Sequence, residues 1–202
     1  MSGLAKGDDG RRRCWWGGST PDYAAYHDEE WGRPVADDRG IYERLVLEGF
    51  QSGLSWLTIL RKREGFRAAF ANFDIDSVAR FGKRDVDRLL GDASIVRHRG
   101  KIEAAIANAK AAAALDVPLA ELVWSHAPPG RRKAPRALED LPPLTPESTA
   151  LSKELKRRGF RFVGPTTAYA AMQACGVVND HIAGCWVRAE VERERRAVRA
   201  RL

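Results

Sequence analysis

The stretch LSKELKRRGFRFVGPTTAYAAMQACG, residues 151–176, contains two helical patterns separated by a turn bounded by glycines. Leucines alternate with basic side chains before Gly159, and Pro165 follows Gly164 at a position where proline favours the first turn of a helix. The pattern predicts a helix, a glycine hairpin and a second helix. Such a turn can present backbone N–H groups to an anion such as a DNA phosphate, although a purely structural helix–turn–helix has the same spacing.

Helical periodicity also dominates the residues before this stretch. Apolar residues recur at helical spacing over residues 37–114, and strand signals are almost absent. Ser55 is predicted to cap a helix that begins at Trp56, and Asp76 and Asp85 are expected to cap two later helices. We therefore expect an all-α fold.

Two segments depart from this pattern. Six of the ten prolines lie in residues 125–148, which we interpret as a surface loop or linker. Residues 186–202 combine apolar positions at helical spacing with mixed charges, so a docking or partly frayed basic helix is expected there.

Composition narrows the class of protein. The chain has 202 residues, enough for one domain or two closely packed small ones. No apolar run approaches the roughly 20 residues needed to span a bilayer, and the N-terminal residues lack the apolar region of a secretory signal. Three cysteines form an odd, sparse set that favours a reducing compartment over a disulfide scaffold. We expect no membrane association and a cytoplasmic location.

The net charge of +7 permits nucleic acid as a partner. Residues 1–13 carry four basic and two acidic side chains, and residues 186–202 carry six and three. Most of the excess therefore lies at the two ends, and basicity alone supports DNA binding only weakly.

A single carboxylate, Glu48, lies inside the apolar and aromatic stretch LEGFQSGLSW, residues 47–56. Glutamate is rarely buried without a partner, and burial raises its pKa unless a cation or hydrogen bonds offset it. The alternative is a glutamate on the solvent face of an amphipathic helix. Gly49 and Gly53 are predicted to break the helix into a tight loop before Trp56. A carboxylate, a loop and an indole ring would then share one wall.

Aromatic residues are dense in RCWWGGSTPDYAAYHDEEWG, residues 13–32, which is typical either of the wall of a site or of an aromatic mini-core. Cys14 and His27 in this block are good zinc ligands, but a pair cannot close a tetrahedral site. His181 and Cys185, four residues apart, would complete a closed site of two cysteines and two histidines. The alternative is a buried cysteine and a core histidine.

Taken together, RCWW, YAAYHDEEWG, LEGFQSGLSW, IVRHRGKI, SKELKRRGFRFVGPTTAYAAMQACG and VNDHIAGC resemble, in this order, the motifs of the 3-methyladenine-DNA glycosylase I family. That family belongs to the helix-hairpin-helix glycosylases, so the resemblance implies an almost wholly helical, two-lobed fold with a base pocket between the lobes. We expect a glycosylase domain over residues 14–185, preceded by a flexible basic segment at residues 1–13 and followed by a basic helix or tail at residues 186–202.

The resemblance implies hydrolysis of the bond between 3-methyladenine and deoxyribose in alkylated double-stranded DNA, with release of the free base. The target base must leave the duplex to be reached. One structural zinc ion per chain would join the ends of the domain through Cys14, His27, His181 and Cys185. A monomer is expected.

Roles in the base pocket follow from the same resemblance. Glu48, the proposed catalytic residue, and Tyr26 would hydrogen-bond the base, and Trp56 would stack on it. Trp16 and Tyr23 would complete the aromatic wall. Because methylation at N3 makes the base cationic, an aromatic box and an ionised Glu48 would attract it, so we expect the ionised form once the base is bound.

Roles toward DNA are implied as well. Gln51, Gly53 and Leu54 match the wedge that fills the vacated stack. The residues expected to hold phosphate are Gly159, Phe160, Arg161, Phe162, Val163, Gly164 and Thr166. Thr166 also stands where bifunctional relatives carry a lysine, so no lyase step is expected.

The general base is not assigned, because Asn179 stands where the wider superfamily has an aspartate, with Asp180 beside it. Two other classes of protein remain as alternatives. A non-enzymatic DNA-damage binding module would need no cavity. A zinc-dependent hydrolase would have water in place of one of the four metal ligands.

Overall fold

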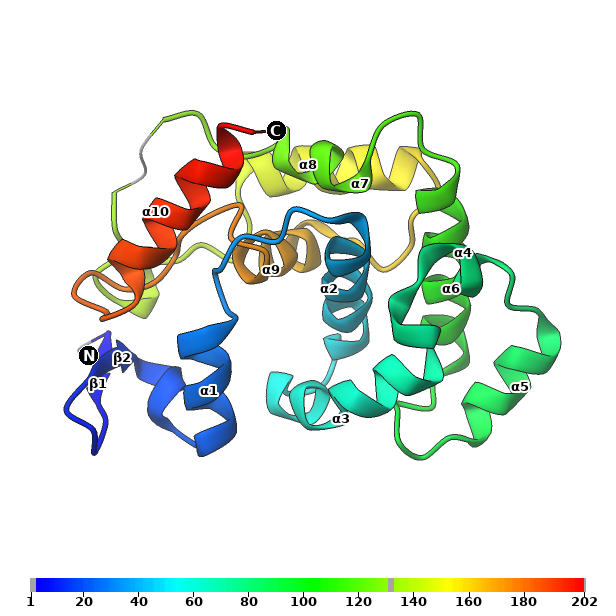
Figure 1. The fold of residues 1–202 in the computed structure, drawn as a ribbon, viewed down its shortest axis with the longest axis horizontal. Helices are drawn as coiled ribbons and strands as arrows, with labels where there is room; N and C mark the ends of the chain where they lie inside the picture. The colour runs from blue at the N-terminus through cyan, green and yellow to red at the C-terminus, as the bar shows by residue number, and fades with distance from the viewer. Residues whose placement is uncertain (1–2, 131–132, 202) are drawn as a thin grey trace.

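The computed structural model describes residues 3–130 and 133–201, so residues 131 and 132 of the proline-rich segment lie outside the described residues. The protein is mainly helical (Figure 1). The α-helices of the described residues are α1 (Pro21–Glu29), α2 (Asp38–Gln51), α3 (Trp56–Ala69), α4 (Ile75–Ala79), α5 (Lys83–Gly91), α6 (Arg99–Ala113), α7 (Leu119–Trp124), α8 (Pro146–Arg157), α9 (Pro165–Ala174) and α10 (Arg188–Arg199). Three short 3₁₀ helices are η1 (Trp15–Gly18), η2 (Ala71–Phe73) and η3 (Leu138–Asp140). None of the helices in these residues has the length and apolar character needed to cross a membrane.

Two short strands within residues 4–14 accompany the mainly helical fold that the sequence predicts. β1 (Leu4–Lys6) and β2 (Arg12–Cys14) pair antiparallel. The hairpin is held by Arg13, whose guanidinium donates hydrogen bonds to Asp9 at 2.6 Å and to Asp28 at 2.7 Å. Strands of three residues are too short to show alternation, and this hairpin is held by the ion pairs of Arg13 and by Leu4 and Cys14, which pack with buried residues of the C-terminal segment. This explains why the sequence shows no strand signal.

The long helix α2 occupies the centre of the main core. It packs against α3, α6, α7 and α9, and Figure 1 shows α4–α6 on one side of it and α1, α10 and the strands on the other. Ile41 and Leu45 of α2 are fully buried, and the ring of Phe50 lies 4.7 Å from that of Phe66 in α3. A second, smaller buried cluster joins the two ends of the chain and consists of Cys14, Ile182, Cys185, Val187 and Val191.

Helix α2 ends later than the sequence predicts. It continues through Gly49 to Gln51, and a Cβ atom at residue 49 would lie 3.4 Å from the Cβ atom of Phe162. Gly49 therefore permits close packing on the hairpin instead of breaking the helix. Of Gly49 and Gly53, it is Gly53, with φ of +80°, that takes the left-handed conformation that favours glycine. Ser55 then caps α3 by accepting a hydrogen bond from the amide of residue 58, as predicted.

Two helix caps were assigned to the wrong residue. Asp74 rather than Asp76 caps α4, because its carboxylate accepts the amide hydrogen of Ser77. Helix α5 begins after Gly82, and Asp85 lies inside its first turn, where its carboxylate accepts the hydrogen of the Gly82 amide. Both aspartates stabilise a helix start, which is why the pattern found the helices but not their first residues.

Helices α8 and α9 pack against each other and are joined by the hairpin of residues 158–164. Pro165 is the first residue of α9, as predicted. Asn108 of α6 binds both backbone polar groups of one hairpin residue: the amide of Arg161 donates to Asn108 Oδ1 at 2.7 Å, and Asn108 Nδ2 donates to the Arg161 carbonyl at 3.0 Å. The turn is thus fixed against the main core.

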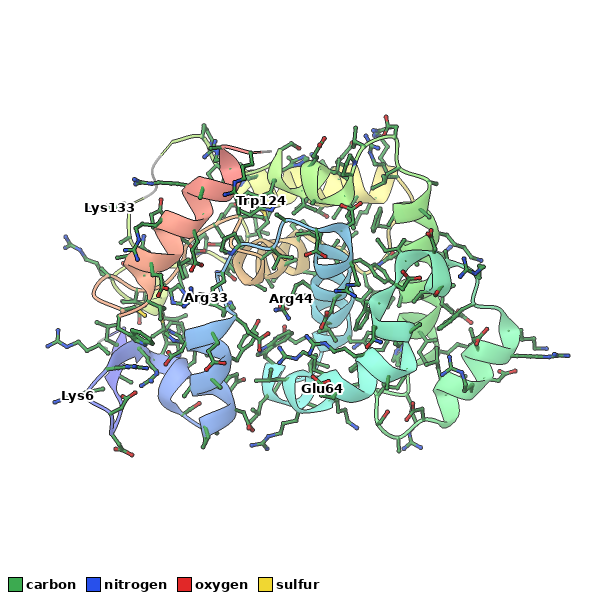
Figure 2. All side chains as sticks on the ribbon, in the orientation of Figure 1. Lys6, Arg33, Arg44, Glu64, Trp124 and Lys133 are labelled. Atoms are coloured by element: carbon green, nitrogen blue, oxygen red, sulfur yellow. The ribbon has the colours of Figure 1, made fainter. Side chains whose placement is uncertain are left out.

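The C-terminal helix α10 is docked on the rest of the protein. Val191 is fully buried, and Arg33, labelled in Figure 2, forms ion pairs with Glu190 and Glu194. The side chain of Arg195 donates to the Val177 carbonyl at 2.9 Å. Of the two states considered for this segment, docked or partly frayed, residues 188–199 are docked.

Candidate active site and metal centre

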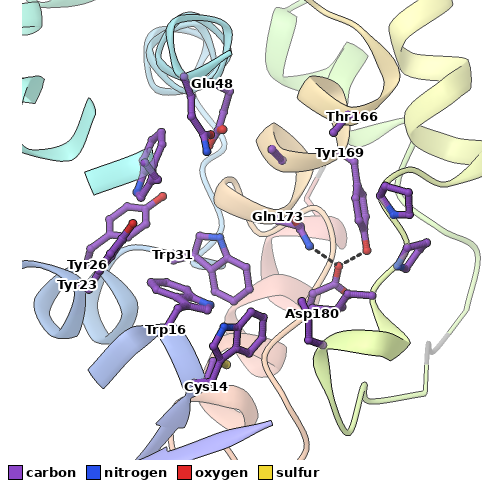
Figure 3. A pocket seen from close by; sticks show the side chains of 18 residues that line it. Cys14, Trp16, Tyr23, Tyr26, Trp31, Glu48, Thr166, Tyr169, Gln173 and Asp180 are labelled. Carbon is purple, nitrogen blue, oxygen red and sulfur yellow. Dashed lines mark hydrogen bonds between the residues drawn. The ribbon is translucent and has the colours of Figure 1, made fainter. Parts of the chain in front are cut away.

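A cavity of about 430 Å³ opens between the N-terminal aromatic block, the end of α2, the start of α3 and helix α9 (Figure 3). This volume is in the usual range for a small-molecule site. The residues predicted from the sequence that line it are Trp16, Tyr23, Tyr26, Glu48, Gln51, Trp56 and Thr166. Residues far apart in the chain are therefore brought to one cavity.

Helix α1 positions the aromatic wall. Thr20 caps it by accepting the amide hydrogen of Tyr23 at 3.2 Å, so this helix begins where the two tyrosines can project together. The ring of Tyr26 lies 5.3 Å from that of Trp56 at an interplanar angle of 41°, and Trp16 meets Tyr23 edge-on at 5.5 Å. These rings give the cavity a broad π surface that suits a flat, cationic or electron-poor ligand.

Glu48 faces this surface from α2 (Figure 3) and is only 7% exposed. Within the described residues its carboxylate accepts no hydrogen bond and forms no ion pair. Burial raises the pKa of Glu48 to about 8, and the positive charge of Arg44, one helical turn earlier, opposes that rise. The acceptor sites of Glu48 are therefore available to a ligand.

The other side of the cavity contains polar groups to which the sequence analysis gave no role. The hydroxyl of Tyr169 and Nε2 of Gln173 both donate to the carboxylate of Asp180, the latter at 3.0 Å (Figure 3). The i, i+4 spacing of Tyr169 and Gln173 on α9 was an available signal, but a shared helix face does not reveal what it faces. Asn179 is directed elsewhere, because its side chain donates to Glu192 and to the Arg188 carbonyl. Of these two neighbouring residues, Asp180 lines the cavity and Asn179 does not.

The proline-rich segment supplies another part of the wall. It was interpreted as a surface loop or linker, but Leu138, Leu141, Pro142 and Pro143 line the cavity. Proline has no N–H group to leave unsatisfied, so a segment rich in proline can present apolar surface without a helix or strand. The irregular sequence of this segment therefore gave no indication that it forms part of the cavity wall.

The loop after α2 lies beside the cavity. Leu54 is 41% exposed and, like Gly53, is not part of the lining, whereas Gln51 is. Lys101 of α6 fixes the start of this loop by donating from Nζ to the Ser52 carbonyl at 2.6 Å and to the Phe50 carbonyl at 2.9 Å. A held loop thus presents an apolar side chain to solvent next to the cavity.

Among the predicted hairpin residues, only Thr166 reaches the cavity. Phe162 has φ of +54° and is 42% exposed. The amides of Phe160 and Arg161 donate within the protein, but within the described residues those of Phe162, Val163 and Gly164 do not. The second half of the hairpin therefore has N–H groups available to an anion.

The four predicted metal ligands meet in one buried cluster. The ligand atoms of Cys14, His27, His181 and Cys185 all lie within 4.8 Å of one another. Cys185 Sγ is 3.5 Å from His27 Nε2 and 3.6 Å from His181 Nδ1, and Cys14 Sγ is 3.6 Å from the same Nδ1. Such a cluster can hold a metal ion with four protein ligands.

The surroundings of the cluster orient these ligands. His27 Nδ1 lies 2.8 Å from an Asp28 carboxylate oxygen, and His181 Nε2 lies 3.0 Å from the Trp31 carbonyl, so the remaining ring nitrogens point into the cluster. The hydrogen bond from Cys14 lowers the pKa of Cys185, whereas this pairing and burial raise the pKa of Cys14. A bound dication would favour the loss of the proton from both thiols.

Each end of the cluster is next to a wall of the cavity in the sequence. Tyr26 precedes His27, Asp180 precedes His181, and Trp16 follows Cys14 by two residues. Holding the ligands therefore also holds residues of both walls.

A helical protein with an aromatic cavity, a buried carboxylate that has no partner among the described residues, and an adjacent hairpin with open amides has the features expected of a DNA glycosylase. The comparisons with known proteins specify which kind. The chain belongs to the methyladenine glycosylase family, whose model matches residues 16–189.

Three relatives illustrate the match. DNA-3-methyladenine glycosylase 1 of Escherichia coli (strain K12) is 49% identical over 179 residues, which cover 86% of this chain and 95% of that protein. A crystal structure of 3-methyladenine DNA glycosylase I has a TM-score of 0.83 at 49% identity and covers 86% of this chain and 98% of its own. A tyrosine-to-phenylalanine variant of 3-methyladenine DNA glycosylase I in complex with 3-methyladenine has a TM-score of 0.82 at 34% identity and covers 87% and 97%.

Proposed function

We propose that this enzyme removes 3-methyladenine from alkylated double-stranded DNA by hydrolysing its N-glycosidic bond. The products are free 3-methyladenine and an abasic site, and no lyase step follows. The observation that carries the proposal is Glu48, a buried carboxylate with no hydrogen-bond partner among the described residues, on the wall of an aromatic cavity. The relative in complex with 3-methyladenine supports the choice of base.

Recognition combines stacking with hydrogen bonding. Trp56 stacks on the flipped base, Tyr26 and Glu48 hydrogen-bond its edge, and Trp16 and Tyr23 complete the wall. N3-methylation gives the base a positive charge, which the ring faces and an ionised carboxylate attract. Because Glu48 has a raised pKa in the empty cavity, the arrival of the cationic base favours loss of its proton.

The charge of the base also explains how the bond breaks. The electron pair of the C1′–N9 bond moves to the base, which leaves as a neutral molecule and needs no strong acid. Water adds to C1′ and releases a proton. Glu48 orients the base and stabilises the positive charge that develops on the sugar. Thr166 in place of a lysine supports a reaction without a Schiff base.

Contacts to DNA are assigned to two loops. Leu54, with Gln51 and Gly53, fills the gap left by the flipped base, and the exposure of Leu54 next to the cavity supports this role. The hairpin holds a phosphate group, mainly through the open amides of Phe162 and Gly164. The positive end of α9 adds to this attraction.

We assign a structural zinc ion to the cluster of Cys14, His27, His181 and Cys185. Tetrahedral zinc with the usual Zn–S and Zn–N bond lengths separates sulfur from nitrogen by about 3.6 Å. The sulfur-to-nitrogen distances of 3.5 and 3.6 Å in the cluster fit this value. Four protein ligands leave no position for water, so this ion stabilises the fold and takes no part in the reaction.

The remaining assignments concern the whole molecule. We propose a monomer that acts on DNA in the cytoplasm, with a glycosylase domain over residues 14–185. The segments before and after it, residues 1–13 and 186–202, add basic charge that attracts phosphate without base specificity.

The decisive experiment measures release of free 3-methyladenine from methylated duplex DNA by the unaltered protein and by Glu48→Gln, both checked for fold and bound zinc. We expect release by the first and a loss of 10²-fold or more in the second, roughly the effect of removing an electrostatic group from an active site. Glu43→Gln is the matched control, because Glu43 is on the same helix but pairs with Arg67 outside the cavity.

Other outcomes favour other functions. A folded, zinc-loaded protein that binds methylated DNA but releases no base would be a damage-binding module. Loss of activity on removal of the metal, without loss of fold, would favour a zinc-dependent hydrolase. Full activity of Glu48→Gln would show that the catalytic role proposed for Glu48 is wrong.

A further inference from the structure

Arg44 is a buried cation close to the proposed base-binding groups. It precedes Glu48 by one helical turn on α2 and is only 9% exposed (Figure 2). Residues at this spacing project from the same helix face. The positive charge of Arg44 opposes the effect of burial on the pKa of Glu48 and of Tyr26. A buried guanidinium therefore acts on two groups expected to touch the base.

The partners of Arg44 do not neutralise it. Its Nη2 donates to Glu30 Oε2 at 3.0 Å, but Glu30 also receives hydrogen bonds from Nη1 and Nη2 of Arg63, the latter at 2.8 Å. Two guanidinium groups thus share one carboxylate, which leaves one positive charge. Nη1 of Arg44 is buried and has no hydrogen-bond partner among the described residues.

Glu48 has the complementary deficit, because its carboxylate is buried without a cation in direct contact. A buried unpaired charge is unfavourable, so the excess positive charge of the Arg44 cluster favours the ionised form of Glu48 over its protonated form. We propose that Arg44 is a positioning residue that supplies the counter-charge of Glu48 in the empty cavity, and that Glu30 tethers Arg44 so that it does not itself enter the base site.

The other charged or titratable groups around Glu48 do not supply this counter-charge. They come from the elements packed on α2 and from the facing wall: Tyr26 and Glu30 near α1, Arg63 on α3, Lys101 on α6, Cys175 after α9, and Asp180. Lys101 is committed to the carbonyls of Phe50 and Ser52, and Arg63 to Glu30. The positive charge of Arg44 is the influence that opposes the effect of burial on the pKa of Glu48.

The direct test is the titration of Glu48 in the unliganded protein, followed by carbon NMR of labelled glutamate carboxyls. The Glu48 signal is assigned by its absence in Glu48→Gln. In Arg44→Met, a side chain of similar length without charge, we expect the midpoint to rise by about one pH unit or more, the usual effect of losing a nearby opposite charge. Arg44→Lys restores the charge and is expected to return the midpoint toward its original value.

Two further variants separate this role from a structural one. Arg63→Met leaves Glu30 to Arg44 alone but keeps the Arg44 guanidinium in place, so we expect a smaller rise of the midpoint than in Arg44→Met. Arg44→Gln keeps a donor for Glu30 while removing the charge, and it replaces Arg44→Met if that variant does not fold. An unchanged midpoint in a folded neutral variant, or an equal shift in Arg63→Met, overturns the proposal.

The consequence for catalysis rests on the proposed function, whereas the titration does not. The acid limb of kcat/KM for base release reports the free enzyme and is expected to move upward with the NMR midpoint in the neutral variants. A shifted midpoint in a protein that releases no base would support the role of Arg44 and reject the proposed function. If the apparent pKa of the acid limb stays the same while the NMR midpoint moves, the ionisation of Glu48 does not determine that limb.

Discussion

The hydroxyl of Tyr169 donates a hydrogen bond to the carboxylate of Asp180, on the side of the cavity away from Glu48 (Figure 3). Both residues are almost fully buried, and Asp180 directly precedes His181 of the candidate metal cluster. The bond therefore joins helix α9 to the segment that enters the metal cluster. This wall of the cavity is held by a polar contact, whereas the facing wall is held by aromatic packing.

Tyr169→Phe removes that bond without changing the ring. We expect a loss of about 1–3 kcal/mol in the free energy of unfolding, because a buried acceptor loses a donor, and a weaker binding of 3-methyladenine. Denaturant unfolding and base titration measure the two effects. Tyr42→Phe is the control, since it removes the buried bond to the Ala105 carbonyl far from the cavity. If both variants bind the base equally, Tyr169 has only a structural role.

Glu48→Gln should change how stability depends on pH. The pKa of Glu48 is about 8 in the folded protein, above its ordinary value of 4.5, so the folded state holds the proton more tightly than the unfolded state. The protein therefore loses stability as pH rises from about 4.5 to about 8. Glutamine mimics the protonated form and avoids this loss.

We expect the variant and the unaltered protein to be similarly stable near pH 4.5, and the variant to be more stable above pH 8 by roughly 1–4 kcal/mol. Denaturant midpoints over this range measure the difference. A difference that does not vary with pH would contradict a raised pKa.

Cys185→Ala should abolish stable metal binding. With three ligands left, we expect zinc below one equivalent per chain and a loss of at least about 2 kcal/mol in stability, since metal binding contributes to folding free energy. Elemental analysis and thermal unfolding measure these quantities. Cys175→Ala is the control, because that thiol is buried but is not part of the cluster. Retention of a full equivalent of zinc by Cys185→Ala would exclude Cys185 as a ligand.

Leu54→Ala should affect DNA more than the protein. Leu54 is exposed, so we expect stability to change by less than about 0.5 kcal/mol. Release of 3-methyladenine from duplex DNA should fall, whereas release from single-stranded DNA, which has no partner strand to reseal, should fall much less. Val117→Ala, at another exposed apolar residue, is the control. Equal loss on both substrates would argue against a wedge.

Lys101→Met should loosen the loop that carries Leu54. The buried ammonium group holds the carbonyls of Phe50 and Ser52, and methionine cannot replace these bonds. We expect faster amide hydrogen exchange at residues 53–55 and a lower rate of base release. Lys62→Met, which removes an exposed bond to the Ala93 carbonyl, should change neither. Unchanged exchange in Lys101→Met would mean that the loop is held by other contacts.

The features predictable from the sequence were those with a local signal. Pro165 and Ser55 mark helix starts by their own backbone preferences, whereas the four residues of the metal cluster were brought together by the family resemblance. Arg44 and Tyr169 gave no such signal, because a helical position says which residues share a face but not what lies opposite. The strand of residues 4–6 was missed because a remote ion pair fixes it.

For a related reason, the sequence did not show that the proline-rich segment lines the cavity. Leu141 and Pro143 become a wall only because α9 and the aromatic block leave a space there, and no local pattern describes such a space. The tertiary packing of the chain, not its local secondary-structure propensity, makes these residues part of the cavity wall.

The cluster of Cys14, His27, His181 and Cys185 also sets an order of events during synthesis of the chain. The first two residues of the cluster leave the ribosome long before the last two. Until then the N-terminal aromatic block lacks the contacts that the cluster gives it. The cavity can close only after residue 185 has emerged. A polypeptide that ends before residue 185 therefore cannot complete the cluster that joins the two ends of the chain.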